Sequence, residues 1–303
     1  MRKQIITNHK MISCLTIGKF GRLGNQLFQY AALKSLSLEN NLKIVLPYLT
    51  NSYHHGQKSL LPEFNLDVKY MNRPLLGLLL HRKYNEKEEH IYNYDENFFK
   101  LKDFTSIKGY FQNLKYFKKY KDQICMELTP KKKYIDSAQK IISEIKSKYP
   151  NHELVSLHIR LGDNITINKD FRDILYGSSM QTLDQSSMFA KYINKSIDFF
   201  RSKNIKFLIF FGGSRDENDD SDKDWVNRNF KSDDFMVMPS ENPLIDYSLI
   251  SLCDHNILSH ASSFSWWAAY TNRNKNKIMI APKDYYVTRE NNNILFDESF
   301  TLL

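Results

Sequence analysis

The sequence is poor in cysteine and has no long apolar run. Its three cysteines, Cys14, Cys125 and Cys253, are far apart and form no C-x-x-C pair, which argues against a disulfide framework and against a zinc site. The longest apolar run, Pro74–Leu80, is far shorter than the roughly 20 residues that a membrane span needs. The N-terminus lacks the apolar core and cleavage site of a signal peptide. We therefore expect a cytoplasmic protein that at most rests on the inner face of a membrane.

Low-complexity segments and short repeats are also absent, which excludes disordered and solenoid classes. Hydrophobic residues make up 42% of the 303 residues and charged residues 25%, the profile of a globular chain. This length exceeds the usual range of roughly 100–200 residues for one domain. We expect two domains, 1–150 and 151–303, with a boundary where a lysine-rich helix ends in Tyr149-Pro150-Asn151.

Acidic residues are too few to balance the basic ones. Lysine and arginine number 43 against 34 acidic residues, a formal net charge of +9, with runs at Lys118–Lys121 and Lys131–Lys133. Such runs are either a solvated face or an attraction for an anionic partner, such as a nucleotide diphosphate or an anionic membrane. No zinc-finger, RNP or basic-zipper pattern accompanies the charge, so we expect no nucleic-acid partner.

The order of apolar segments predicts an α/β fold. A strand at Ile12–Ile17, a glycine loop, a helix from Asn25 to about Leu38 and a strand at Leu42–Leu46 open a βαβ unit. Residues Tyr48–Asn97 show no steady periodicity and predict loops and short helices. Further on, a strand is expected at Thr105–Tyr110 and a helix at Lys131–Lys148.

Regular alternation in the second half predicts a doubly wound parallel sheet. The five expected strands are Leu154–Ile159, Ile205–Phe211, Phe235–Met238, His255–Ser259 and Lys277–Ala281. The helices expected between them are Ser186–Ser202, Lys223–Asn229, Pro243–Leu252 and Phe264–Thr271.

Three segments lie where ligands bind in such folds, just after a strand. The first has glycines at 18, 21 and 24, a spacing that does not match the dinucleotide fingerprint. It offers close backbone approach, with Arg22 and Asn25 at the start of the helix. It is either a structural turn or a functional loop.

The second segment is His158–Asp163. His158 and Arg160 are two residues apart at the end of a strand, so their side chains leave the same face. An arginine at the mouth of a parallel sheet is suited to bidentate contact with a phosphate. The alternative is an Arg160–Asp163 ion pair that only ties down the loop.

The third segment is Ser259–Trp267, in which Ser262 and Ser263 cap the next helix. The start of a helix presents free N–H groups to an anion, and the helix dipole assists. The tryptophans Trp266 and Trp267 are expected in the core. The two serines are expected beside Arg160, because parallel strands end at one edge.

These segments together resemble the bacterial α-1,2-fucosyltransferases of glycosyltransferase family 11. The resemblance rests on Gly21–Tyr30, His158–Asp163 and Ser262–Trp267, with weaker matches at Gly109–Gln112 and Ile280–Lys283. It implies a GT-B-like fold, in which an acceptor-side domain and a GDP-fucose-binding domain face each other across a cleft. The last residues could return to the first domain.

The implied reaction transfers L-fucose from GDP-fucose to the 2-hydroxyl of a galactose-type acceptor, with inversion and with no cofactor or essential metal. Arg160 would hold the β-phosphate, His158 would lie near the nucleotide and Asp246 would accept hydrogen bonds from guanine. The residues expected to contact the phosphates and the sugars are Ser262, Ser263, Arg22 and Asn25. Asp163 is the candidate catalytic base, unless a dissociative transition state dispenses with one.

Two departures from the family pattern bear on these roles. Leu161 stands where many members carry a second arginine, and Phe211–Ser214 replaces a Phe-Ser-Asp-Asp-like turn. The first concentrates the phosphate role on Arg160, and the second puts donor contacts from that turn in doubt.

Two other classes of function stay open. Aspartates at 220, 222 and 224 match the D-x-D element of metal-dependent GT-A transferases, although clustered aspartates before a helix are more often solvated. A non-catalytic glycan-binding protein could keep the same fold. The basic charge suits surface-glycan assembly, such as O-antigen synthesis for lipopolysaccharide, close to a membrane.

Overall fold

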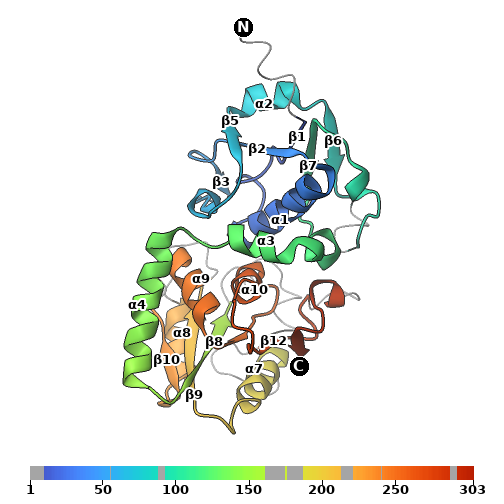
Figure 1. Ribbon diagram of the computed structural model, residues 1–303. Coiled ribbons are helices and arrows are strands. Elements are labelled where there is room, and N and C mark those ends of the chain that lie inside the picture. Colours follow the sequence, from blue (N-terminus) through green and yellow to red (C-terminus); the bar gives the residue numbers. More distant parts are fainter. Residues whose placement is uncertain are drawn as a thin grey trace. The chain divides into compact units, whose positions relative to one another are not determined.

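The protein forms two compact α/β units in a computed structural model (Figure 1). The structure describes residues 10–54, 56–87, 93–160, 175, 187–212, 221–239, 241–286 and 292–303. Contacts divide the chain into Met1–Lys131 and Lys132–Leu303. This division lies one helix before the expected boundary at Tyr149–Asn151, because α4 (Lys132–Lys148) packs against α9 (Pro243–Leu252) of the second unit.

The first unit is built on a five-stranded parallel sheet in the order β5-β2-β1-β7-β6. Its strands are β1 (Met11–Ser13), β2 (Lys43–Pro47), β5 (Lys69–Met71), β6 (Arg82–Asn85) and β7 (Thr105–Lys108). Its helices are α1 (Leu23–Asn40), α2 (Arg73–Leu79) and α3 (Lys121–Glu127), and a small hairpin joins β3 (Tyr53–His54) to β4 (Gln57–Lys58). The predicted βαβ opening is confirmed.

The prediction of only loops and short helices for Tyr48–Asn97 is wrong. This region supplies two strands of the sheet, β5 and β6, as well as α2. Both strands are short outermost strands without a buried residue, so they carry no apolar alternation that the sequence could reveal. Leu76 of α2 and Leu80 directly after it join a core cluster with Met11 and Val45.

The second unit contains a six-stranded parallel sheet in the order β10-β9-β8-β11-β12-β13. Its strands are β8 (Glu153–Ile159), β9 (Ile205–Phe211), β10 (Phe235–Val237), β11 (His255–Ile257), β12 (Met279–Ala281) and β13 (Phe300–Leu302). The five predicted strands are present, so the doubly wound GT-B-like class is confirmed. The sixth strand was not predicted: the last residues pair with β12 in this sheet and belong to the second unit, where a return to the first domain was considered.

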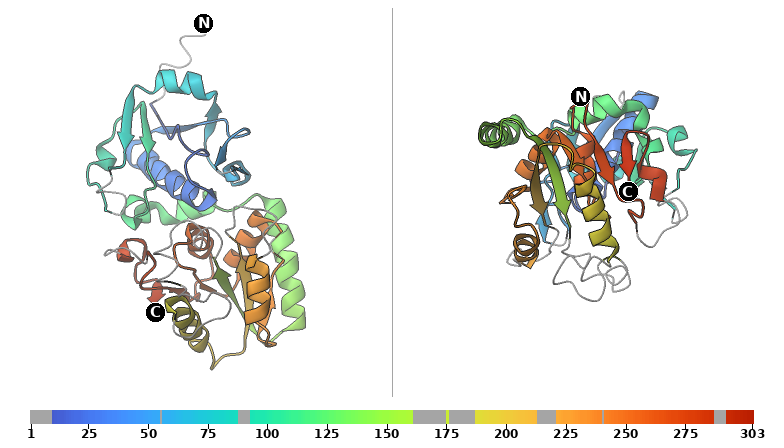
Figure 2. Two further views of the ribbon diagram at one scale, coloured as in Figure 1. Left: turned by 180° about the vertical axis from the view of Figure 1, so that it is seen from behind. Right: turned by 90° about the horizontal axis from the view of Figure 1, so that it is seen from below.

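Helices cover both faces of the second sheet. They are α7 (Met188–Asp198), α8 (Ser221–Asn229), α9 and α10 (Ser263–Tyr270), with α4 preceding β8. Figures 1 and 2 show α4 in green and α7 in yellow on opposite sides of this sheet. Val155, Leu157 and Ile159 of β8 pack in one cluster with Phe189 of α7. The even-numbered residues of β8 therefore face the other side.

Cys14, Cys125 and Cys253 are buried and carry free thiols. Among the helices that the structure describes, none combines the length and the apolar character needed to cross a bilayer.

A buried ion pair fixes α1 in the first unit. Lys34 is 3% exposed, and its ammonium lies 2.7 Å from Glu127 Oε1. Glu127 also accepts a hydrogen bond from the Tyr30 hydroxyl, so one carboxylate serves two residues of α1. Asp67 lies 3.2 Å from the same ammonium, but its side chain is 86% exposed.

Glu127→Ala should lower the free energy of unfolding by about 3–5 kcal/mol, because it removes the buried partner of Lys34 and the acceptor of the Tyr30 hydroxyl and leaves only the solvated Asp67 beside the buried ammonium. Asp67→Ala is the matched control and should cost at most about 1 kcal/mol, since its carboxylate is solvated. Urea unfolding followed by circular dichroism measures both, because all three tryptophans lie in the second unit. Equal effects of the two substitutions would contradict the assigned role of Glu127.

Two buried histidines make the second unit sensitive to acid. His158 is 6% exposed and His260 is 1% exposed. Burial lowers the pKa of each to about 3, and the nearby Arg160 contributes to the shift at His158. Both rings are therefore neutral at physiological pH.

Below pH 6.5 the unfolded chain binds protons at these histidines and the folded chain does not, so the free energy of unfolding should fall with the pH. The slope is at most about 1.4 kcal/mol per pH unit for each histidine. Urea unfolding followed by tryptophan fluorescence at pH 6.5, 6.0 and 5.5 measures it. His158→Gln should reduce the slope and the exposed His81→Gln should not; an unchanged slope in His158→Gln would refute the assignment.

Candidate active site

The strand order of the second sheet reverses at β8. The chain proceeds from β8 to β9 and β10 on one side, and then crosses back to β11 on the other side of β8. Adjacent strands whose connections leave in opposite directions open a crevice at their carboxyl ends, where ligands bind in this class of fold. The segments that follow β8 and β11 are the predicted His158–Asp163 and Ser259–Trp267.

Arg160 joins these two segments directly. Its backbone N–H donates to Ser259 Oγ at 3.1 Å, and its guanidinium Nη1 donates to the Ala261 carbonyl oxygen at 3.3 Å. Ala261 has a φ of +48°, which turns the chain sharply between β11 and α10. Arg160 is half-buried just after the carboxyl end of β8, and the Nε of its guanidinium is buried.

His158 lies near Arg160, whose charge contributes to the lowered pKa of the imidazole. Its ring centroid is 5.8 Å from that of Phe264, on α10. Its Nδ1 is buried and has no hydrogen-bond partner within the described part of the chain. A neutral imidazole offers one donor and one acceptor, so this ring can recognise a polar ligand group without adding charge.

The two predicted serines lie in different environments. Ser262 is fully buried, and its Oγ accepts the N–H of Ser265 at 3.3 Å as the N-cap of α10. Ser263 is half-buried in the first turn. The first turn of a helix has N–H groups without intrahelical partners, which favour an anion there. The cap prediction is confirmed for Ser262, whose hydroxyl oxygen is committed to the helix.

Asp246 lies in the first turn of α9 and is 8% exposed. Helix α9 packs on α10, with the rings of Tyr247 and Phe264 5.8 Å apart. Asp246 therefore belongs to the layer formed by α9 and α10, which His158 contacts through Phe264. Asp163, the candidate base, lies outside the described residues.

In the first unit, the glycine loop turns through left-handed conformations. Gly18 has a φ of +79° and Gly21 a φ of +85°, which side-chain-bearing residues rarely adopt. A Cβ on Gly21 would lie 2.6 Å from Asn25 Cβ, so the loop folds closely over the start of α1. Arg22 is the N-cap residue of α1 and is half-buried, as is Asn25.

The side chain of Asn25 is held by a segment to which the sequence assigned no role. Gln112 Nε2 donates to Asn25 Oδ1 at 2.9 Å. Gln112 follows β7, and the turn that carries it is bound by Glu86, a residue that the sequence did not single out. The resemblance of Gly109–Gln112 to a family segment could have pointed to this turn. No sequence pattern pointed to Glu86.

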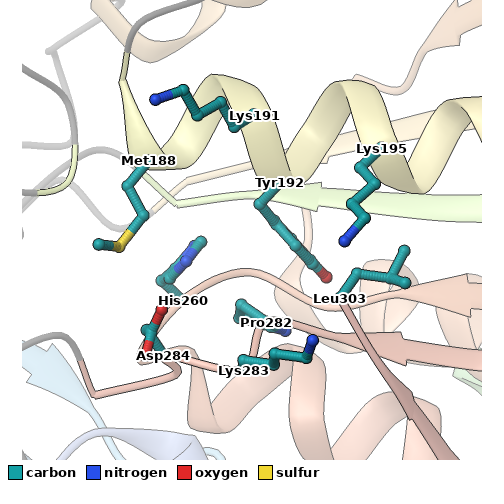
Figure 3. Close-up of a pocket in the computed structure, with 9 residues that line it drawn as sticks. All are labelled: Met188, Lys191, Tyr192, Lys195, His260, Pro282, Lys283, Asp284 and Leu303. Atoms are coloured by element: carbon teal, nitrogen blue, oxygen red, sulfur yellow. The ribbon is translucent and has the colours of Figure 1, made fainter.

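A hollow of ≈ 480 Å³ lies on the α7 side of the second sheet (Figure 3). Met188, Lys191, Tyr192 and Lys195 of α7 line one wall, and the segment 282–284 after β12 lines another. Neither His158 nor Arg160 is among its lining residues. His260 is the only residue of the serine segment among its lining residues.

Metal-binding geometry is absent from the described residues, where no group of three or more His, Cys, Asp or Glu side chains gathers. Of the D-x-D aspartates, residue 220 lies outside the described part and residues 222 and 224 fall in the first turn of α8. Acidic residues in a first turn interact favourably with the helix dipole, which is the structural alternative weighed above.

Comparison with known proteins identifies the family. The model of "Glycosyl transferase family 11" matches residues 2–297. An α-1,2-colitosyltransferase of Escherichia coli is 26% identical, over 90% of this chain and 92% of its own length. The O-antigen biosynthesis glycosyltransferase WbnK of Escherichia coli is 24% identical, over 96% of this chain and 100% of its own. Galactoside α-(1,2)-fucosyltransferase 1 of Rattus norvegicus is 25% identical, and the match spans 62% of its length.

Among solved structures, the fucosyltransferase NodZ from Bradyrhizobium has a similar fold. It superposes with a TM-score of 0.52 at 13% identity, over 86% of this chain and 92% of its own. This likeness extends across both units and supports the α/β assignment of each. Because the family model matches nearly the whole length, the chain belongs to glycosyl transferase family 11 and is a glycosyltransferase.

Proposed function

We propose that this chain is an inverting α-1,2-fucosyltransferase, which transfers L-fucose from GDP-fucose to the 2-hydroxyl of a galactose-type acceptor. The observation that carries the proposal is the meeting of the Arg160 guanidinium and the start of α10 at the point where the strand order reverses. The relatives named as galactoside α-(1,2)-fucosyltransferases support the linkage. NodZ, whose crystals were soaked with GDP-fucose, supports the donor class.

The chemistry of the donor fits a site built from fixed dipoles and one cation. When the bond between fucose C1 and the phosphate oxygen breaks, its electron pair stays on GDP and negative charge grows on the β-phosphate. Arg160 and the N–H groups of the first turn of α10 stabilise that charge without having to protonate the leaving group. Ser263 can donate its hydroxyl to a phosphate oxygen, while Ser262 holds the turn in shape.

The nucleoside is assigned to the helix side of the same crevice. His158 offers a neutral donor and acceptor beside Phe264, and Asp246 offers a carboxylate that can accept N–H groups of guanine. Both side chains are nearly buried, so their hydrogen bonds to a base would be little screened by water.

Arg22 and Asn25 of the first unit are assigned to the fucosyl group or to the acceptor. The acceptor 2-hydroxyl attacks fucose C1 from the side opposite GDP, which inverts the configuration, and its proton passes to a base or to water. Asp163 remains the candidate for that base. Its place in the sequence, three residues after Arg160, is the support for this role.

The biological setting proposed is surface-glycan synthesis at the cytoplasmic face of a bacterial membrane. The O-antigen glycosyltransferase WbnK is similar over its whole length, and the net charge of +9 favours contact with an anionic lipid surface.

One observation favours a second donor. A relative that is 26% identical is named an α-1,2-colitosyltransferase, so an activated colitose belongs in the donor panel beside GDP-fucose. The same phosphate-binding residues would serve either donor, because the difference lies in the sugar.

Arg160→Ala should leave a folded protein whose transfer rate is lower by about 10²–10³-fold, because the growing charge on the β-phosphate loses its cationic partner. Arg201→Ala is the matched control: this guanidinium is 76% exposed and pairs with Asp198, so the rate should not change. The assay uses labelled GDP-fucose, a panel of galactosides and linkage analysis of the product. Near-normal turnover of Arg160→Ala would rule out the phosphate assignment.

Transfer should continue in excess EDTA, since the proposed charge stabilisation comes from Arg160 and a helix terminus. Complete loss in EDTA, restored by a divalent cation, would favour the metal-dependent GT-A mechanism. Isothermal titration with GDP separates the non-catalytic alternative: an enzyme of the proposed kind binds GDP, whereas a glycan-binding protein ignores it.

A further inference from the structure

The first sheet also has a point where its strand order reverses, between β1 and β7. From β1 the chain proceeds to β2 and β5 on one side, and β7 and β6 lie on the other. The glycine loop follows β1 and the turn Gly109–Gln112 follows β7, so both leave the same carboxyl edge. Leu15 N–H donates to Ser106 Oγ at 3.2 Å, which binds the two strand ends together. A ligand crevice is expected here on the same grounds as in the second unit.

A half-buried carboxylate holds the turn after β7. Glu86, directly after β6, accepts the backbone N–H of Tyr110 at 2.6 Å and that of Phe111 at 3.1 Å. Burial raises the pKa of Glu86 to about 7, although both backbone hydrogen bonds act to lower it. No described Lys or Arg side chain compensates this carboxylate. A carboxylate shielded from water without a cationic partner lowers the stability of the fold. The presence of Glu86 at this position therefore points to a role in the site.

The turn that Glu86 holds is conformationally constrained. A Cβ on Gly109 would collide with the Cβ of Glu86, so only glycine allows the carboxylate to approach the backbone. Phe111 has a φ of +53°, a left-handed conformation that is unusual for a residue with a bulky side chain. Residues held in such conformations cluster at functional sites, where the strain fixes a geometry.

The constrained turn makes one contact with the predicted site residue Asn25 and one with the glycine loop. Gln112 Nε2 donates to Asn25 Oδ1 at 2.9 Å, and the Tyr110 ring stacks on Phe20 in the glycine loop with centroids 4.5 Å apart. This hydrogen bond uses the amide oxygen of Asn25 as an acceptor. The amide nitrogen, which is the donor of the side chain, can then bind a ligand. The orientation of that amide depends on Gln112, and the position of Gln112 depends on the turn.

We propose that Glu86 is a positioning residue of the transfer reaction: by holding the turn Gly109–Gln112, it fixes the orientation in which Asn25 presents its amide to a sugar hydroxyl. This proposal rests on the proposed function of the site. In this role Glu86 acts through the two backbone amides that it accepts and not by contact with the substrate.

The test is a double-mutant cycle of Glu86→Gln and Gln112→Ala, measured on the full chain with GDP-fucose and the best acceptor of the panel. Each substitution should lower kcat by about 10–100-fold, the effect of a displacement of about 1 Å in a positioned group. The KM for GDP-fucose should stay within about twofold. The double variant should lose no more than the worse single variant, because both act through Asn25. Glu96→Gln, the same change at an exposed glutamate nearby, should have no effect.

A second readout is independent of activity. The side-chain amide signal of Gln112, assigned by its absence in Gln112→Ala, should shift in the NMR spectrum of Glu86→Gln and not in that of Glu96→Gln. If wild type transfers no fucose, the proposed function fails, and the NMR comparison still decides whether Glu86 sets the position of Gln112. If Glu86→Gln fails to fold, Gln112→Ala alone must reproduce the loss of kcat. Unchanged kcat in Gln112→Ala, multiplied losses in the double variant, or an unmoved Gln112 signal would overturn the proposal.

Discussion

The hydrogen bonds from Arg160 to Ser259 and to the Ala261 carbonyl join the carboxyl ends of two neighbouring parallel strands. They form because β8 and β11 are adjacent although about 100 residues of chain separate them, which is a consequence of the doubly wound topology. The guanidinium that they orient stays at the sheet edge beside the start of α10. The sheet therefore brings a fixed cation and a set of free N–H groups to one place, and this combination suits a diphosphate.

The first unit has the same strand-order reversal, with different side chains at its carboxyl edge. Its glycine loop and its Gly109–Gln112 turn meet where the strand order reverses, and both depend on left-handed residues to approach each other. A hydrogen-bonding amide and stacked aromatic rings are features that suit a neutral, hydroxyl-rich ligand better than an anion. The chemical difference between the two edges thus parallels the difference between a sugar and a nucleotide diphosphate.

The sequence predicted the features that depend on short-range order. Strands β8 and β9 are seven residues long and mostly apolar, and Asn242-Pro243 signals the start of α9. Arg160 is recognisable as a charge at the end of a buried strand. The outer strands β5, β6 and β13 were not predicted, because strands of three or four residues with at most one buried side chain carry no periodicity. Glu86 was invisible for a different reason: it acts through backbone amides 24 and 25 residues away, and only the paired strands bring them together.

A crystal structure of the chain with GDP would test the central claim most directly. The account predicts that the diphosphate lies within hydrogen-bond distance of the Arg160 guanidinium and of the N–H groups in the first turn of α10. A diphosphate bound instead in the hollow beside α7, among Lys191, Lys195 and Lys283, would contradict it.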